Sequence, residues 1–268
     1  MSSRPSSIVG RVGHMSPLAM PSPTLSHVNR IVSSSSGTDK LFMLYSYSAY
    51  LAQAVLRSKR VSKLDWADRV QKLQTLISDA RVLYRLFGLL PILSWAQSLN
   101  DPKQAPSDGQ LKLIEKLQCW SMLLYYPLEH YYYLAGKGIF KATTERINKI
   151  AIWSCRFWAA YVALQVLHIR REYQLLALSK RQLGLARSRS EKSEVDSSTL
   201  VEQEKIEIQK IRAKETYLYN DSWVQAGYLP LTMHWSLPNG ILPSSTWVGV
   251  CGTVAAAFGL RQTWAATA

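Results

Sequence analysis

The clearest hydrophobic pattern along the chain lies in residues 68–88, "DRVQKLQTLISDARVLYRLFG". On a helical wheel the apolar side chains of this segment fall within an arc of roughly 140°. They are Val70, Leu73, Leu76, Ile77, Ala80, Leu83, Tyr84 and Phe87. The remaining positions are polar, and cations outnumber anions among them. The pattern predicts an amphipathic helix, which either lies on an anionic membrane surface or packs in a helical bundle with its polar face in solvent.

Two apolar blocks follow in the middle of the chain. Residues 117–136 contain five tyrosines together with Pro127 and Glu129. A charged residue at mid-span costs about 2.5–3.5 kcal/mol, so this block predicts a helix at the membrane interface and not a full span. Residues 150–169 are interrupted only by Arg156 and, at about 20 residues, are long enough to cross a bilayer core. They predict either a span or a buried helix of a bundle.

The third apolar block, residues 241–260, reads "ILPSSTWVGVCGTVAAAFGL" and contains no charged residue. It predicts a transmembrane helix, and a hydrophobic core helix is the alternative. Small residues recur four apart along it, which allows a neighbouring helix to approach closely within lipid. The candidate helix-packing residues are Gly249, Gly252, Ala256 and Gly259.

Polar segments separate these blocks and suggest how the chain is organised. Residues 1–37 are rich in Ser and Pro and contain no acidic residue, which predicts a disordered tail, although a mitochondrial transit peptide has a similar composition. Residues 186–199 predict a charged linker and residues 200–226 a polar helix. The pattern as a whole predicts an all-α fold with a single helical membrane domain over residues 38–268. Its expected parts are amphipathic helices in 38–99, apolar and tyrosine-rich helices in 110–185, and one to three membrane-embedded helices.

Composition narrows the class of partner. The chain has 32 Lys and Arg against 18 Asp and Glu, a formal charge of +14, which favours an anionic partner, either nucleic acid or a membrane surface. The basic residues interleave with apolar blocks and match no nucleic-acid-binding motif. Nine Trp and fourteen Tyr against five Phe are typical of membrane interfaces, so we expect a membrane partner and no nucleic acid.

No motif in the sequence indicates covalent chemistry. Neighbouring residues on a helix point about 100° apart, so Glu129 and His130 do not form a converging acid–base pair. The three cysteines show neither metal-ligand nor redox spacing and predict free, buried thiols. We therefore expect no catalytic residues, no cofactor and no metal, and the protein is not expected to be an enzyme.

Four segments, taken in order, carry a resemblance to a known family. They are "SGTDKLFMLYSYSAYL", "ISDARVLYRLFGLLPIL", "YYPLEHYYYLA" and "LPLTMHWSLPNGILPSSTWVGVCGTVAAAFGLRQTW". Together they resemble the successive signatures of the peroxin-eleven family in a fungal-type form, over roughly residues 30 to 268. The resemblance implies a peroxisomal membrane protein that elongates and divides peroxisomes. The charged stretch around 186–216 departs from the family pattern.

The resemblance also implies roles for residues of the amphipathic helix, which in this family inserts into one leaflet. The expected lipid-headgroup contacts are Arg69, Lys72, Arg81 and Arg85. The expected membrane-inserting face comprises Val70, Leu73, Ile77, Ala80, Tyr84 and Phe87. The implied partners are an anionic phospholipid membrane, further copies of the chain, and a fission machinery of a dynamin-related protein with its adaptor.

Two other functions stay open at this point. One is a channel for small metabolites, in which Arg156, Glu129 and His130 would line a polar path between helices. The other is a membrane scaffold that recruits fission factors without bending lipid itself. A mitochondrial membrane is the alternative location.

Overall fold

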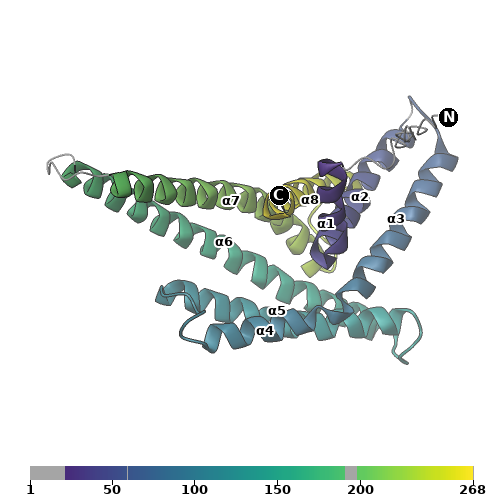
Figure 1. Ribbon diagram of the computed structural model, residues 1–268. Coiled ribbons are helices and arrows are strands. Elements are labelled where there is room, and N and C mark those ends of the chain that lie inside the picture. Colours follow the sequence, from purple (N-terminus) through teal and green to yellow (C-terminus); the bar gives the residue numbers. More distant parts are fainter. Residues whose placement is uncertain (1–21, 59, 191–197, 268) are drawn as a thin grey trace, which may run out of the picture.

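The computed structural model describes residues 22–58, 60–190 and 198–267. Within these residues the chain forms eight α-helices and one short 3₁₀ helix, with no β-strand (Figure 1). This confirms the all-α class predicted from the hydrophobic pattern. Cys119, Cys155 and Cys251 are free thiols, as their spacing predicts.

The described chain begins with two consecutive helices, α1 (Pro23–Ser33) and α2 (Ser35–Leu56). Two serine N-caps explain why they form, since the hydroxyl of Ser22 accepts the N–H of Leu25 and that of Ser34 accepts the N–H of Gly37. Proline at the first helical position is compatible with the helix because its missing N–H would be unpaired there. The disordered tail predicted for residues 1–37 is therefore wrong from residue 22 onward, where serine and proline act as capping residues. Residues 1–21 lie outside the described residues.

The predicted amphipathic helix is α3 (Leu64–Tyr84), which packs antiparallel against α2. Ion pairs lie at both ends of this helix pair, Arg57–Asp68 at 2.9 Å and Asp39–Arg81 at 2.8 Å. A 3₁₀ turn, η2 (Arg85–Phe87), leads into α4 (Leu89–Asn100).

The next two helices, α5 (Gly109–Gly136) and α6 (Thr144–Ser190), also run antiparallel. Their register is defined by contacts spaced along both helices. Arg171 donates to Asp108 at 2.7 Å, Gln118 to Gln165 at 2.6 Å, and the hydroxyl of Ser121 to the carbonyl of Phe157 at 2.5 Å. The Asp108 side chain also caps α5 by accepting the N–H of Leu111.

Helix α6 has 47 residues and is about 70 Å long, so its C-terminal half extends past the rest of the protein. Helix α7 (Ser198–Ser236) returns along it, and the two form the arm at the left of Figure 1. Lys214–Glu172 and Lys180–Glu215 ion pairs join the arm. The helix predicted over 200–226 is thus longer than expected. The predicted linker 186–199 is shorter, because α6 continues to Ser190, and residues 191–197 lie outside the described residues.

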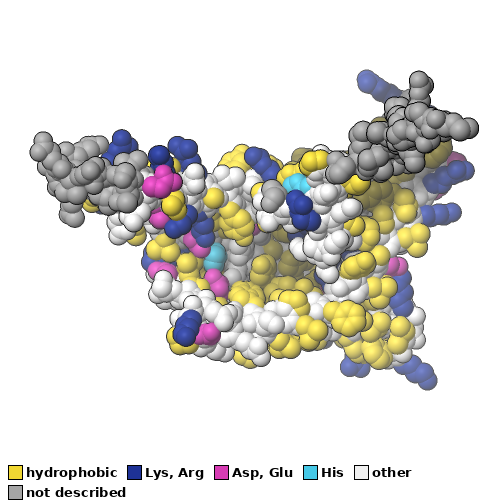
Figure 2. Space-filling view, in the orientation of Figure 1, with side chains coloured by type: hydrophobic (Ala, Val, Ile, Leu, Met, Phe, Trp, Pro, Cys, Tyr) yellow, Lys and Arg dark blue, Asp and Glu magenta, His cyan; other side chains and the backbone are white. Residues whose placement is uncertain are grey.

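The last helix, α8 (Ser245–Thr267), packs between α2 and α7. The main buried cluster lies where these three helices meet, and it comprises Met43, Tyr47, Leu231, Val248, Ala255 and Ala256. A tight loop joins α7 to α8, in which Gly240 has φ +63° and the Nδ1 atom of His234 accepts the N–H of Ile241 at 2.9 Å. The helices therefore form a ring in which α8 returns to α2. Figure 2 shows this ring hollowed at its centre, with hydrophobic side chains inside.

Candidate membrane-binding surface

The outward side of α3 is a row of exposed apolar side chains. Leu73 is 46% exposed and Phe87 is 72% exposed. The other exposed apolar residues of the segment are Leu64, Trp66, Leu76, Leu83, Tyr84 and Leu86. Of the six residues predicted to insert into the membrane, Leu73, Tyr84 and Phe87 are exposed, whereas Val70, Ile77 and Ala80 are partly buried. We call the row formed by Trp66, Leu73, Leu76, Leu83, Tyr84 and Phe87 the outer row.

A different side of α3 packs against α2. Its buried residues are Ala67 and, about two turns on, Gln74, and the partly buried Arg81 continues the same line about two turns beyond Gln74. On a wheel this line lies roughly 100° from the outer row. The most buried residues of the helix are thus small or polar, while most of its large apolar side chains stay exposed, which is unlike an ordinary bundle helix.

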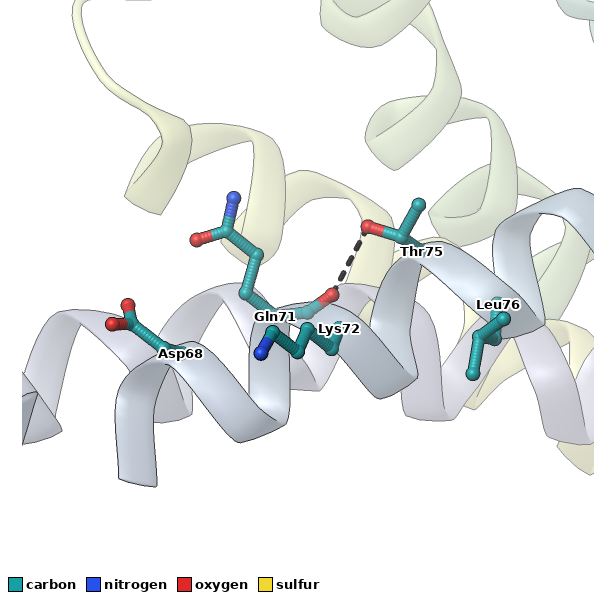
Figure 3. A pocket seen from close by; sticks show the side chains of 5 residues that line it. All are labelled: Asp68, Gln71, Lys72, Thr75 and Leu76. Carbon is teal, nitrogen blue, oxygen red and sulfur yellow. Dashed lines mark hydrogen bonds between the residues drawn. The ribbon is translucent and has the colours of Figure 1, made fainter. Parts of the chain in front are cut away.

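The four predicted headgroup-binding cations divide into two pairs. Arg69 and Lys72 are exposed, although Arg69 contacts Asp65 at 3.1 Å and lies 5.2 Å from the Trp66 ring. Figure 3 shows Lys72 in a surface hollow along α3, where Gln71 and Thr75 project to one side of the helix and Leu76 to the other. Arg81 and Arg85 instead face the interior of the ring and are paired with carboxylates of the protein. The headgroup role predicted for these two residues does not fit this placement.

Arg85 belongs to a cluster that joins α3 to α5. Its guanidinium donates to both carboxylate oxygens of Glu129, at 2.6 and 3.1 Å, and the hydroxyl of Tyr125 donates to the same carboxylate at 2.6 Å. Glu129 is only 3% exposed. Its charge is therefore neutralised within the protein by a bidentate pair.

Asp39 of α2 lies beside the same cluster, near the start of that helix. Its carboxylate accepts from Arg81 at 2.8 Å and lies 3.9 Å from Arg85. Burial alone would raise the pKa of Asp39, but the hydrogen bond and charge of Arg81 and the charge of Arg85 outweigh burial and lower the pKa below its ordinary value. These ion pairs fix α2, α3 and α5 relative to one another, and they are formed by Asp39, Arg81, Arg85 and Glu129.

A second apolar surface follows the outer side of α4 and α5. Trp120 is 65% exposed, and it lies on a ridge of α5 with a spacing of three or four residues. The ridge comprises Leu113, Leu117, Trp120 and Leu124, and Leu90 and Leu93 of α4 are exposed as well. Sequence reasoning treated residues 117–136 as interfacial but did not identify this ridge, although its spacing is visible in the sequence.

Within the described residues, one helix is long and apolar enough to cross a membrane, and this is α6, over the segment Thr144–Ser188. Arg156, the charged residue within its apolar part, has partners in the protein. Its Nε donates to the carbonyl of Ser236 at the end of α7, and its guanidinium lies 4.8 Å from the Trp153 ring. Helix α8, which covers most of the span predicted over 241–260, is not among the described helices that are apolar enough to cross. It begins only at Ser245 and continues past Arg261, so a full-length window includes polar residues, and the span stays a prediction.

The small residues of α8 instead contact α2 of the same chain. A side chain at Gly252 would overlap the Tyr47 ring, and a Cβ at Gly249 would lie 2.8 Å from that of Tyr50. Gly259 lies against Lys40, and Ala256 is fully buried. The close approach expected of these residues is thus made within one molecule.

No cluster of His, Cys, Asp and Glu side chains in the described part of the chain is arranged to hold a metal ion.

Residues 25–264 match the family described as Peroxisomal biogenesis factor 11 (PEX11). The chain belongs to the PEX11 family. It is therefore a peroxisomal membrane protein of the family that acts in peroxisome proliferation and division. The PEX11 match begins within α1 and includes nearly all of α8. It starts at residue 25, slightly earlier than the resemblance seen in the sequence, which began at about residue 30. No curated protein and no solved structure gives a significant match to the chain.

Proposed function

We propose that this PEX11 protein bends the peroxisomal membrane by inserting the outer row of α3 into one leaflet. The observation that supports this most directly is that the outer row is apolar and exposed while a different side of α3 packs on α2. An amphipathic helix lies about 5–10 Å deep at the boundary of headgroups and acyl chains. At that depth it increases the area of one leaflet relative to the other, which favours curvature.

Arg69 and Lys72 are the cations best placed to contact anionic headgroups beside the inserted row. Arg81 and Arg85 have a different role in the proposal, because their pairs with Asp39 and Glu129 hold α3 on the rest of the protein. The inserted helix is then part of a folded body and not a free peptide. We further propose that several copies gather in the membrane and that a dynamin-related protein with its adaptor cuts the resulting tubule.

The proposal is tested with the full-length protein carrying Leu73→Glu together with Leu76→Glu. Both side chains are exposed, so the fold should be retained, whereas burying two carboxylates among acyl chains is strongly unfavourable. In cells that lack their own PEX11 protein, the variant should reach peroxisomes but fail to restore their elongation and number. Fluorescence microscopy of tagged peroxisomes measures both.

The matched control is Gln71→Glu together with Thr75→Glu, which adds the same charge to the other side of α3 (Figure 3). This control should restore peroxisome number as the wild type does. If the Leu73/Leu76 variant restores peroxisome elongation equally well, insertion of α3 is not the source of curvature. A scaffold that only recruits partners would then explain the activity better.

A further inference from the structure

The hollow at the centre of the ring contains a cavity of about 860 Å³. This volume is within the range of small-molecule sites, roughly 300–1,000 Å³. Aromatic rings form much of its wall, and they include Tyr47, Tyr126, Trp158, Tyr161, Tyr228 and Trp235. The outer row of α3 is not part of this wall, so the proposed membrane insertion makes no use of the cavity.

Asp221 of α7 is the unusual residue of this wall. It is 5% exposed, and its two carboxylate oxygens accept hydrogen bonds from the amides of Gln165 at 2.8 Å and Gln225 at 3.0 Å. No cation in the described part of the chain forms an ion pair with it. The other two acidic residues of the wall, Asp39 and Glu129, each have an arginine partner. Neutral amides satisfy the hydrogen-bonding capacity of Asp221 but leave its charge uncompensated, which is unfavourable in a buried position.

The surroundings of Asp221 are suited to a positively charged ligand group. Trp158 and Tyr228 meet edge to face at 5.4 Å, and Tyr161 lies on the same wall. The faces of such rings attract ammonium groups. Gln225 is 7% exposed. Its Oε1 atom is buried and has no hydrogen-bond partner. It offers an acceptor beside the carboxylate.

Lys40 of α2 supplies the opposite charge on the same wall. Its Nζ lies 5.9 Å from the centre of the Tyr228 ring, and it forms no ion pair with any described residue. The wall of the cavity therefore carries an anion, Asp221, and a cation, Lys40, neither of which has an ion-pair partner among the described residues, and the Nζ of Lys40 lies beside the Tyr228 ring. This arrangement is complementary to a zwitterion that carries a phosphate and an ammonium group.

We propose that the cavity binds a phospholipid with a zwitterionic headgroup. The ammonium group lies against Asp221, Gln225 and the neighbouring aromatic rings, and the phosphate lies toward Lys40. A lipid fits better than a free headgroup because many aromatic and aliphatic side chains line the wall beside its polar groups and the protein resides in a membrane. The ligand would neutralise Asp221, whose charge is otherwise left without a partner.

The test uses the full-length protein in a non-ionic detergent and native mass spectrometry to count bound lipids during titration. The probes are dioleoyl phosphatidylcholine, dioleoyl phosphatidylethanolamine, dioleoyl phosphatidylglycerol and free phosphocholine. The wild type should bind the two zwitterionic lipids at least tenfold more tightly than phosphatidylglycerol or free phosphocholine. This comparison requires no variant, so it holds even if a substitution disturbs folding.

Asp221→Asn should weaken binding of both zwitterionic lipids at least tenfold and leave phosphatidylglycerol binding unchanged. Tyr161→Leu should weaken the same two lipids. Glu207→Gln, which removes a charge from an exposed position of the same helix, should have no effect. The Leu73→Glu, Leu76→Glu variant should bind these lipids normally, so a failure of the proposed membrane insertion is distinguished from a failure of this site.

Equal binding of zwitterionic and anionic lipids, or unchanged binding by Asp221→Asn, would overturn the proposal. Free phosphocholine bound as tightly as phosphatidylcholine would exclude a lipid as the ligand.

Discussion

At the scale of single residues, the most informative position is Glu129. In the sequence it is an acidic residue within an apolar, tyrosine-rich block, and it argued against burial of that block in a membrane. In the structure the charge is matched by Arg85 and by the Tyr125 hydroxyl. Helical spacing could not identify this pair, because the two residues lie on different helices. For the same reason the headgroup role that the family resemblance implied for Arg81 and Arg85 took no account of Asp39 or Glu129, which lie on other helices.

Glu129→Gln should destabilise the protein by about 3 kcal/mol, because it removes the bidentate partner of Arg85 in a largely buried position and leaves only Asp39, at 3.9 Å. Thermal unfolding in detergent measures the change. The control is Glu215→Gln, which breaks the exposed pair with Lys180 and should cost less than about 1 kcal/mol. Replacing Arg85 and Glu129 together by leucine should recover most of the loss, and similar losses from the two single variants would contradict the argument.

At the scale of elements, hydrophobic periodicity predicted the helices better than their partners. The apolar arc of α3 is real, but only the structure shows that α2 packs on a neighbouring polar side. The small residues of α8 were expected to pack against a helix, and nothing in their spacing indicates that the helix is α2 of the same chain. Spacing along one helix identifies a face, whereas the choice of partner depends on contacts between distant segments.

Gly252→Ala is expected to destabilise the protein by about 1–3 kcal/mol, because its Cβ would overlap the Tyr47 ring in the main core. Gly184→Ala is the matched control on α6, where a Cβ meets no neighbouring atom. That substitution should instead stabilise the helix by about 0.5–1 kcal/mol. Melting temperatures that move in the same direction for both variants would argue against close packing of α8 on α2.

The N-terminus of α5 should make stability depend on pH. The hydrogen bond from Arg171, followed by that from the Leu111 backbone, lowers the pKa of Asp108 from 3.8 to about 2. The folded state therefore favours the ionised carboxylate of Asp108. The stability that this carboxylate contributes is fully present above its ordinary pKa and is lost as the pH falls through about 2. The wild type should melt higher than Asp108→Asn at pH 5, and this difference should disappear near pH 2. A difference that does not change with pH would exclude this cause.

At the scale of the whole molecule, the sequence predicted a single helical domain but not its closure into a ring. The closure depends on contacts between α1 and α8, which lie far apart in the sequence, and no local pattern encodes them. His27 of α1 contacts the carbonyl of Trp264 at 3.1 Å, and the Nε of Arg30 donates to the carbonyl of Thr267 at 2.8 Å. Helix α1 and the end of α8 therefore lie together (Figure 1), which constrains how the chain is placed in a membrane.

Two ends on the same side of a bilayer require an even number of crossings, so α6 cannot cross alone. Helix α5 is the natural second crossing, because it runs antiparallel along α6, has an exposed apolar ridge, and has its Glu129 charge neutralised by Arg85. Single cysteines at Lys103, Lys141 and Lys180, in a chain without its three native cysteines, test this on intact peroxisomes. With a membrane-impermeant maleimide, positions 103 and 180 should label alike and position 141 oppositely. Equal labelling of 103 and 141 would mean that the α5–α6 pair does not cross, and the exposed ridge of α5 would then need another explanation.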